Sequence, residues 1–272
     1  MRAAFAYEFM RLRTIRSTYW LIGIALAFQL ILTMIIAWRL PDSGSLSGGD
    51  TTVSNLLTLG ASAGFAPLLM AYVIGILGVF SMGHEYRHGM IRATLTAIPS
   101  RTNVFIAKVA TTGLVAAAVA FASMLIGVLS ALTFGVSLPG TSVLGKLTLG
   151  VVLFTVFFTW SGFAYAAIIR NQTAAVAMVM LVPSVVESII RAVLISIKAA
   201  SDDPSGKGAV VTILKYLPYD AGGQMYTRAS INDLFSIFGF TPFGPLGGGI
   251  VFGVFVGALL AISYALFLRR DA

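Results

Sequence analysis

Charged residues are scarce in this chain of 272 residues, at 10% of the total against 58% hydrophobic residues. A soluble globular domain carries about 25% charged residues, which help to cover a surface that faces water. This chain cannot cover such a surface, so a soluble protein is excluded. We expect an all-α polytopic membrane protein, because a helix satisfies its own backbone hydrogen bonds within lipid.

Cysteine is absent, and histidine occurs only twice, as His84 and His88. Without cysteine, neither a disulfide framework nor a thiolate metal site can form. The net charge of +8 would favour a nucleic-acid partner if the protein were soluble. In a membrane protein, basic residues gather at one membrane face instead. We therefore expect contact with the lipid bilayer and none with nucleic acid.

Six apolar segments have the length that a bilayer requires, which is about 20 residues at a rise of 1.5 Å each. These predicted crossings are Tyr19–Trp38, Phe65–Met82, Val104–Phe134, Leu147–Ile169, Thr173–Ile195 and Leu246–Leu268. The third is too long for one straight crossing. Gly113 and Gly127 are the positions at which we expect it to bend or break.

Residues 1–17 are basic and amphipathic, and a helix of this kind lies in the headgroup layer of a membrane. We therefore predict an interfacial helix at 1–17, followed by one transmembrane domain of six crossings at 18–272. The amphipathic pattern is imperfect, because Glu8 and Arg16 interrupt the apolar side of the helix.

Shorter apolar runs are predicted on the opposite side of the membrane. Thr52–Ala63 is apolar enough to be an outer helix or an extension of the second crossing. The external loop 199–245 contains the runs Ala209–Leu217, which stops at Pro218, and Leu234–Phe240. Both are about half the length of a crossing, so they are predicted to be re-entrant or interfacial helices packed against protein.

Lysine and arginine near the ends of the crossings predict the orientation. The side that holds the N-terminus carries 11 basic and 3 acidic residues, and the opposite side carries 7 of each. The whole net charge of +8 therefore lies on one face. Both termini are predicted to be cytoplasmic, in the cell membrane of a prokaryote, which agrees with an even number of crossings.

The segment Ser81–Lys108 is a long polar interruption between the second and third crossings, on the predicted cytoplasmic side. Ile91, Leu95 and Ile98 recur at the spacing of one face of a short helix. Pro99 ends that helix, and Ser100 is placed to cap the next one. We predict that residues 83–103 form a cytoplasmic loop that binds another protein; contact with lipid headgroups is the alternative.

Within this segment, His84-Glu85-Tyr86-Arg87-His88 matches the HExxH pattern, in which two histidines hold zinc and the glutamate polarises water. An intramembrane zinc metalloprotease is therefore the alternative function. A catalytic zinc requires a third protein ligand, and the buried acid elsewhere, Glu187, is predicted at the opposite face. Gly89 follows immediately and would weaken the helix. We therefore expect no metal site.

The same segment resembles the signature that follows the second crossing in permeases of ABC-2-type transporters. The resemblance also covers the amphipathic entry helix, the six crossings and the large outer loop. Met90 departs from it, because threonine is usual there. The matching residues are Glu85, Tyr86, Arg87, Gly89, Ile91, Arg92, Leu95, Pro99, Arg101 and Lys108.

The resemblance implies that these residues couple the crossings to a separate ATPase subunit, which binds ATP and magnesium, and that two permeases work together as a dimer or with a sister subunit. This chain is then expected to have no catalytic site.

Gly140–Lys146 looks like a phosphate-binding loop, but Leu147 stands where serine or threonine is required. The few charges within the crossings favour export of an amphiphilic or hydrophobic substrate. A channel or secondary carrier without an ATPase is the third functional hypothesis.

Two further patterns lie within the crossings. Glu187 and Arg191 are four residues apart, and ionisable residues within a crossing are functional candidates, so both are candidates for the translocation path. Small residues every four positions let another helix approach closely, which predicts a packing face in the last crossing. That face is formed by Gly249, Gly253, Gly257 and Ala261.

Overall fold

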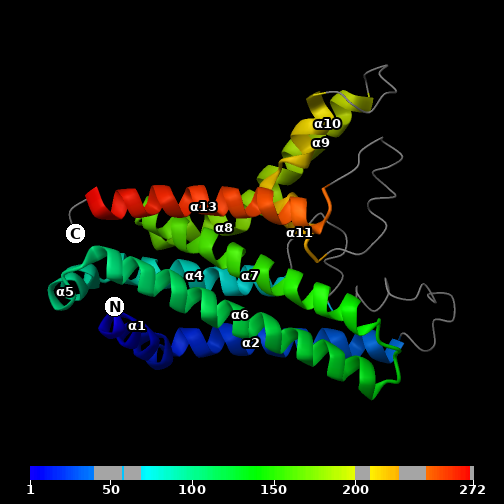
Figure 1. Cartoon of the computed structure of the whole chain (residues 1–272), viewed down its shortest axis with the longest axis horizontal. Coiled ribbons are helices and arrows are strands. Elements are labelled where there is room, and N and C mark those ends of the chain that lie inside the picture. Colours follow the sequence, from blue (N-terminus) through cyan, green and yellow to red (C-terminus); the bar gives the residue numbers. More distant parts are fainter. Residues whose placement is uncertain (40–56, 58–68, 200–208, 227–242, 270–272) are drawn as a thin grey trace.

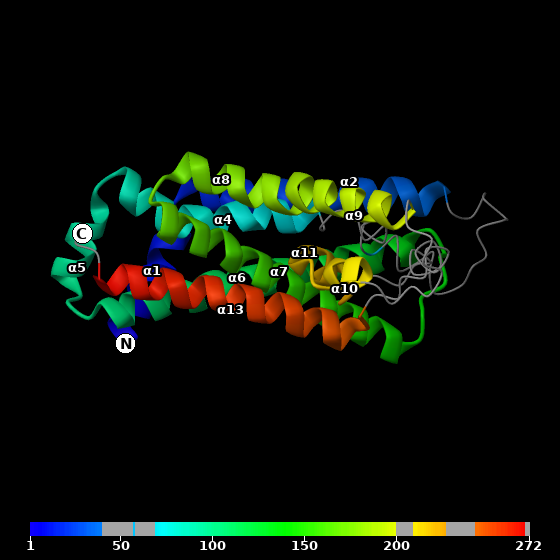
Figure 2. The same ribbon diagram turned by 90° about the horizontal axis from the view of Figure 1, so that it is seen from above.

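The computed structural model describes residues 1–39, 57, 69–199, 209–226 and 243–269. Every element in these ranges is a helix, and the long helices run side by side in an elongated bundle (Figures 1 and 2). The elements are α1 (Arg2–Thr14), α2 (Arg16–Arg39), α4 (Leu69–Arg87), α5 (Met90–Ala97), α6 (Arg101–Thr133), α7 (Thr141–Ile169), α8 (Gln172–Leu181), η2 (Val182–Val186), α9 (Glu187–Ala199), α10 (Ala209–Lys215), α11 (Pro218–Gly223) and α13 (Pro245–Arg269).

Six helical segments of the described chain are long and apolar enough to cross a membrane, which confirms the predicted class of fold. The fifth crossing runs over Gln172–Ile197 and consists of α8, the π-helical turn η2 and α9. Figure 1 places α1 and the last turn of α13 at the same end of the bundle. This is expected for an even number of crossings, because the chain then begins and ends its crossings on the same side of the membrane.

The third crossing is one uninterrupted helix of 33 residues, α6, so the expected break at Gly113 or Gly127 does not occur. Each glycine instead leaves room for a side chain from another part of the chain to pack against α6. A Cβ on Gly113 would lie 2.9 Å from Nε1 of Trp160, which donates a hydrogen bond to the carbonyl of Val109. A Cβ on Gly127 would lie 2.9 Å from Leu57. Close helix packing accounts for these glycines.

The centre of the bundle is the contact between α4 and α7. Phe158 of α7 is fully buried there, with its ring centroid 5.3 Å from that of Tyr72 in α4. The two helices approach so closely that a Cβ on Gly78 would lie 2.1 Å from the carbonyl oxygen of Thr159. Small residues permit such an approach between membrane helices, where dispersion contacts drive association.

The close approach at Gly78 can be tested by Gly78→Ala. The added methyl group meets a backbone oxygen that cannot rotate away, so α4 and α7 must separate. We expect a loss of about 1–3 kcal/mol, measured as a lower midpoint of thermal denaturation of the purified protein. Gly145→Ala is the matched control, because nothing lies within 4 Å of its Cβ. An equal effect of the two substitutions would contradict the proposed close contact.

The first short helix of the outer loop, α10, starts at Ala209 as predicted but ends at Lys215. Pro218, predicted only to stop that run, opens a further helix, α11, which the sequence analysis did not predict. Of the other predicted outer segments, Thr52–Ala63 lies outside the described residues except for Leu57, and Leu234–Phe240 lies outside them altogether.

Candidate functional site

A compact hairpin joins the second and third crossings and is formed by the end of α4, the short helix α5 and the start of α6. Gly89 connects α4 to α5 with a left-handed backbone, at φ 64°, a conformation that glycine adopts without steric cost. α5 ends before Ile98. Ser100 caps α6, its side chain accepting a hydrogen bond from the backbone N–H of Asn103 at 3.4 Å. The predicted helix end and cap are both confirmed.

α5 has one face on the protein and one face exposed. Ile91 is buried, and Leu95 and Ile98 pack against the core. Thr94 is buried too, and its hydroxyl lies 3.3 Å from that of Tyr7 in α1. Arg92 is exposed on the opposite side. The predicted stripe is therefore used within the chain, and the side of α5 that carries Arg92, its basic side, is exposed.

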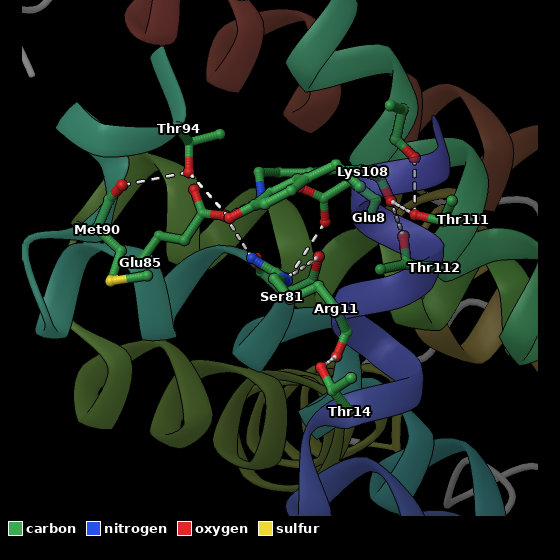
Figure 3. A network of polar contacts seen from close by, with 12 residues as sticks. Glu8, Arg11, Thr14, Ser81, Glu85, Met90, Thr94, Lys108, Thr111 and Thr112 are labelled. Atoms are coloured by element: carbon green, nitrogen blue, oxygen red, sulfur yellow. Dashed lines mark hydrogen bonds and ion pairs between the residues drawn. The ribbon is translucent and has the colours of Figure 1, made fainter. Parts of the chain in front are cut away.

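Directly behind α5, an ion cluster of Glu8, Arg11, Glu85 and Lys108 joins three helices (Figure 3). Lys108 of α6 is completely buried, at 0% exposure, and its Nζ lies 2.6 Å from a carboxylate oxygen of Glu8 in α1. The same ammonium group pairs with Glu85 at the end of α4. Glu8 and Glu85 are themselves 1% and 3% exposed.

Arg11 completes the ion cluster from the edge of α1. Its guanidinium group pairs with Glu85 and also donates a hydrogen bond of 2.6 Å to the backbone carbonyl of Ser81 in α4. Its Nε lies 3.4 Å from the carboxylate of Glu8, one turn earlier. Two acids and two bases thus share one site, and their formal charges cancel.

A buried charge is costly unless it is paired and hydrogen-bonded. Moving α1 away from α4 and α6 would separate Glu8 from Lys108 and Arg11 from Glu85, so the cost of breaking the ion cluster opposes any such motion. The ion cluster therefore fixes α1, the end of α4 and the start of α6 to one another as one body.

Half of the ion cluster is recognisable in the sequence. Glu85 and Lys108 belong to the signature residues, whereas Glu8 stands out only as an interruption of the apolar side of α1, and no pattern distinguishes Arg11. An acid on the otherwise apolar face of an entry helix was the available signal, because such a residue requires a basic partner inside the protein.

The other predicted coupling residues occupy different surroundings. Arg87 is exposed at the end of α4, and Pro99 is exposed between α5 and α6. The ring of Tyr86 lies 5.1 Å from the guanidinium carbon of Arg170. Arg101 donates hydrogen bonds to the carbonyls of Phe267 and Leu268 at 3.3 and 3.2 Å, so it binds the last turn of α13.

The arrangement at His84 and His88 does not favour the zinc protease. The ring of His84 packs against that of Phe80 at a tilt of 41°, with centroids 4.6 Å apart. The carboxylate of Glu85 is engaged by Lys108 and Arg11 and is not placed to polarise water between the histidines. No group of three metal-ligating side chains occurs within the residues that the structure describes.

At the opposite end of the bundle, Glu187 and Arg191 of α9 hold the short helix α11. The carboxylate of Glu187 accepts hydrogen bonds of 2.9 Å from the backbone N–H groups of both Tyr219 and Asp220. Arg191 binds the carboxylate of Asp220, with one contact of 2.8 Å from Nε. Burial raises the pKa of Asp220, and the guanidinium of Arg191 opposes that shift.

α11 is also fastened to α7 and α13. The hydroxyl of Tyr219 donates a hydrogen bond of 3.0 Å to Ser161 and lies 3.1 Å from the hydroxyl of Tyr165. A Cβ on Gly222 would lie 2.6 Å from the ring of Phe252 in α13. Glu187 and Arg191, predicted as candidates for the translocation path, thus bind the short helix α11, which contacts three crossings.

The predicted small-residue face of α13 packs only in its first half among the described residues. Cβ atoms on Gly249 and Gly253 would make ordinary contacts, each at 3.4 Å, with Met225 and Phe157. Nothing lies within 4 Å of a Cβ on Gly257, and Ala261 is exposed. The helix buries the adjacent face instead, through Gly248, Phe252, Val256, Ser263 and Phe267.

Comparison with known proteins adds one match. The family model described as ABC-2 family transporter protein matches residues 4–190, which is more than half of the chain. The matched range includes the whole ion cluster, the hairpin and Glu187. No curated protein matches the chain.

Proposed function

Because the chain belongs to the ABC-2 transporter family and is therefore the multi-pass transmembrane subunit of an ABC transporter, we propose that it exports an amphiphilic or hydrophobic substrate and is driven through its α4–α5–α6 hairpin. A separate ATPase subunit, which binds ATP and magnesium, contacts the exposed basic side of α5. A second permease, either another copy or a sister subunit, completes the transporter in the cell membrane.

The ion cluster is the observation that carries this proposal. A force applied to α5 reaches α4 and α6 at once, because Glu85 and Lys108 join the two helices directly behind α5. Glu8 and Arg11 add the entry helix α1 to the same body. Nucleotide can shift the equilibrium between two transporter states only if the ATPase contacts those states differently. A rigid body that carries α5 allows such a difference to move entire crossings.

The test is co-purification of the full chain with a candidate ABC ATPase, chosen as the one whose gene lies nearest to that of this chain. Reversing one exposed charge with Arg92→Glu removes an attractive contact and adds a repulsive one, so we expect about tenfold less ATPase to be retained. Arg39→Glu is the control, because it makes the same change in charge at the opposite end of the bundle. We expect it to leave retention unchanged.

Two results would contradict the proposal. One is equal retention of the ATPase by Arg92→Glu and by the Arg39→Glu control. The other is substrate transport by the purified chain alone in liposomes, which would instead support a channel or a secondary carrier.

A further inference from the structure

A cationic pocket of about 310 Å³ lies where the end of α4 meets the turn between α7 and α8. Its described lining contains two guanidinium groups, two amides and one hydroxyl, and none of these residues carries a carboxylate. The lining residues are Arg87, Arg170, Asn171, Gln172 and Thr173. The pocket is separate from the ion cluster and contains none of its residues.

Close packing of α4 on the start of α8 forms this pocket. A Cβ on Gly83 would lie 3.1 Å from Cγ of Gln172, so the absence of a side chain at Gly83 lets the two helices approach. Arg87 is four residues further along α4 and lies on the same face of the helix. The approach at Gly83 therefore brings Arg87 beside the turn at Arg170 and Asn171.

Arg170 is positioned by its backbone and by an aromatic ring. Among the described residues it is the one non-glycine residue with a positive φ, at 57°, and its N–H bonds to the carbonyl of Ala166 at 2.9 Å. Its guanidinium carbon lies 5.1 Å from the ring centroid of Tyr86. A guanidinium group over an aromatic face is held by attraction to the ring. The contact with Tyr86 therefore helps to hold the guanidinium group of Arg170 in the lining of the pocket.

We propose that this pocket binds the phosphate of an anionic phospholipid from the membrane leaflet predicted to face the cytosol. Guanidinium groups bind phosphate oxygens through paired, charge-assisted hydrogen bonds. Two such groups, one at the end of α4 and one in the turn between α7 and α8, suit a phosphate that is approached from two sides.

The position of the pocket favours a lipid over the ATPase. In both Figure 1 and Figure 2, α5 extends beyond the turn between α7 and α8, which is set back toward the middle of the bundle. The pocket is therefore at the level where crossings begin, where lipid headgroups and basic side chains meet. This assignment moves Arg87 from the predicted ATPase contact to a lipid contact. It does not depend on the identity of the substrate.

The test measures lipid retained by the purified full-length chain, by native mass spectrometry. Phosphatidylglycerol and phosphatidylcholine with identical acyl chains are added separately. We expect the wild type to prefer phosphatidylglycerol, and Arg87→Gln/Arg170→Gln to weaken its binding by about tenfold or more, because two charge-assisted contacts are lost. Arg87→Gln alone, at an exposed position, should weaken binding less and guards against misfolding of the double variant.

Arg2→Gln/Arg269→Gln is the matched control, since it removes the same charge from exposed positions at the same end of the bundle, and we expect it to keep the preference. Equal retention of the two lipids by the wild type would overturn the proposal. A preference that survives in the double variant while ATPase co-purification is lost would overturn it in favour of a protein contact. Displacement of the lipid by glycerol 1-phosphate at equal concentration would overturn it in favour of a soluble phosphate ester.

Discussion

Replacing Lys108 with methionine should destabilise the protein by about 3–5 kcal/mol, because the substitution leaves a buried negative charge without its partner. Lys108 is completely buried between two acids, Glu8 and Glu85. Methionine preserves most of the volume, so the loss is electrostatic. In a protein of this size we expect a fall of roughly 10 °C in the thermal denaturation midpoint of the detergent-purified chain.

The charge balance of the ion cluster supplies the control. Adding Glu8→Gln to Lys108→Met restores neutrality, since Glu85 and Arg11 then remain as one pair. This double variant should recover part of the lost stability. Lys146→Met at an exposed site should change stability by no more than about 0.5 kcal/mol. If the double variant were less stable than Lys108→Met alone, packing and not charge would explain the role of Lys108.

Glu187→Leu should release α11 from the bundle while leaving the rest of the chain folded. The substitution removes the acceptor for two backbone N–H groups, those of Tyr219 and Asp220, and each unsatisfied buried donor costs about 1–3 kcal/mol. We expect hydrogen–deuterium exchange of these two amides to accelerate by about a hundredfold, which corresponds to a loss of about 3 kcal/mol.

Glu187→Gln is the matched variant, because its amide carbonyl can still accept one hydrogen bond. Its exchange rates should fall between those of the wild type and Glu187→Leu. Exchange of amides in α4 should be the same in all three proteins. Unchanged exchange at Tyr219 in Glu187→Leu would show that the hydrogen bonds to Tyr165 and Ser161 hold α11 without the carboxylate.

The sequence was sufficient for the crossings and for α5, because these depend on local patterns. Long apolar segments predict crossings without knowledge of their neighbours. The stripe at Ile91 and Leu95, with Pro99 and Ser100 after it, predicts a short helix and its end. The structure confirms these features.

Contacts between distant residues could not be predicted in the same way. Glu8 and Lys108 are 100 positions apart, and Arg191 and Asp220 are 29 apart. Helical periodicity describes only which face of a helix a residue occupies. By periodicity alone, Glu8 only interrupts an apolar stripe of α1. In the folded chain, Glu8 pairs with Lys108 of α6. The glycines of α6 illustrate the same limit, since a flexible residue and a site of close contact look alike in sequence.

The π-helical turn η2 has a consequence for the whole fifth crossing. Ala175, Val179, Pro183, Glu187 and Arg191 are all buried, although they occur every four residues. In an uninterrupted α-helix, residues at this spacing drift by about 40° per step. One extra residue in the π-helical turn offsets about 100° of this accumulated drift. A single inward face therefore carries small apolar groups in α8 and ionic groups in α9. Because the turn absorbs one extra residue, deletion of a single residue from 182–186 would restore a regular α-helix and leave Glu187 and Arg191 facing α11. Deletion of two residues would instead rotate α9 by about 100° about its axis and carry both side chains away from α11, although neither had changed.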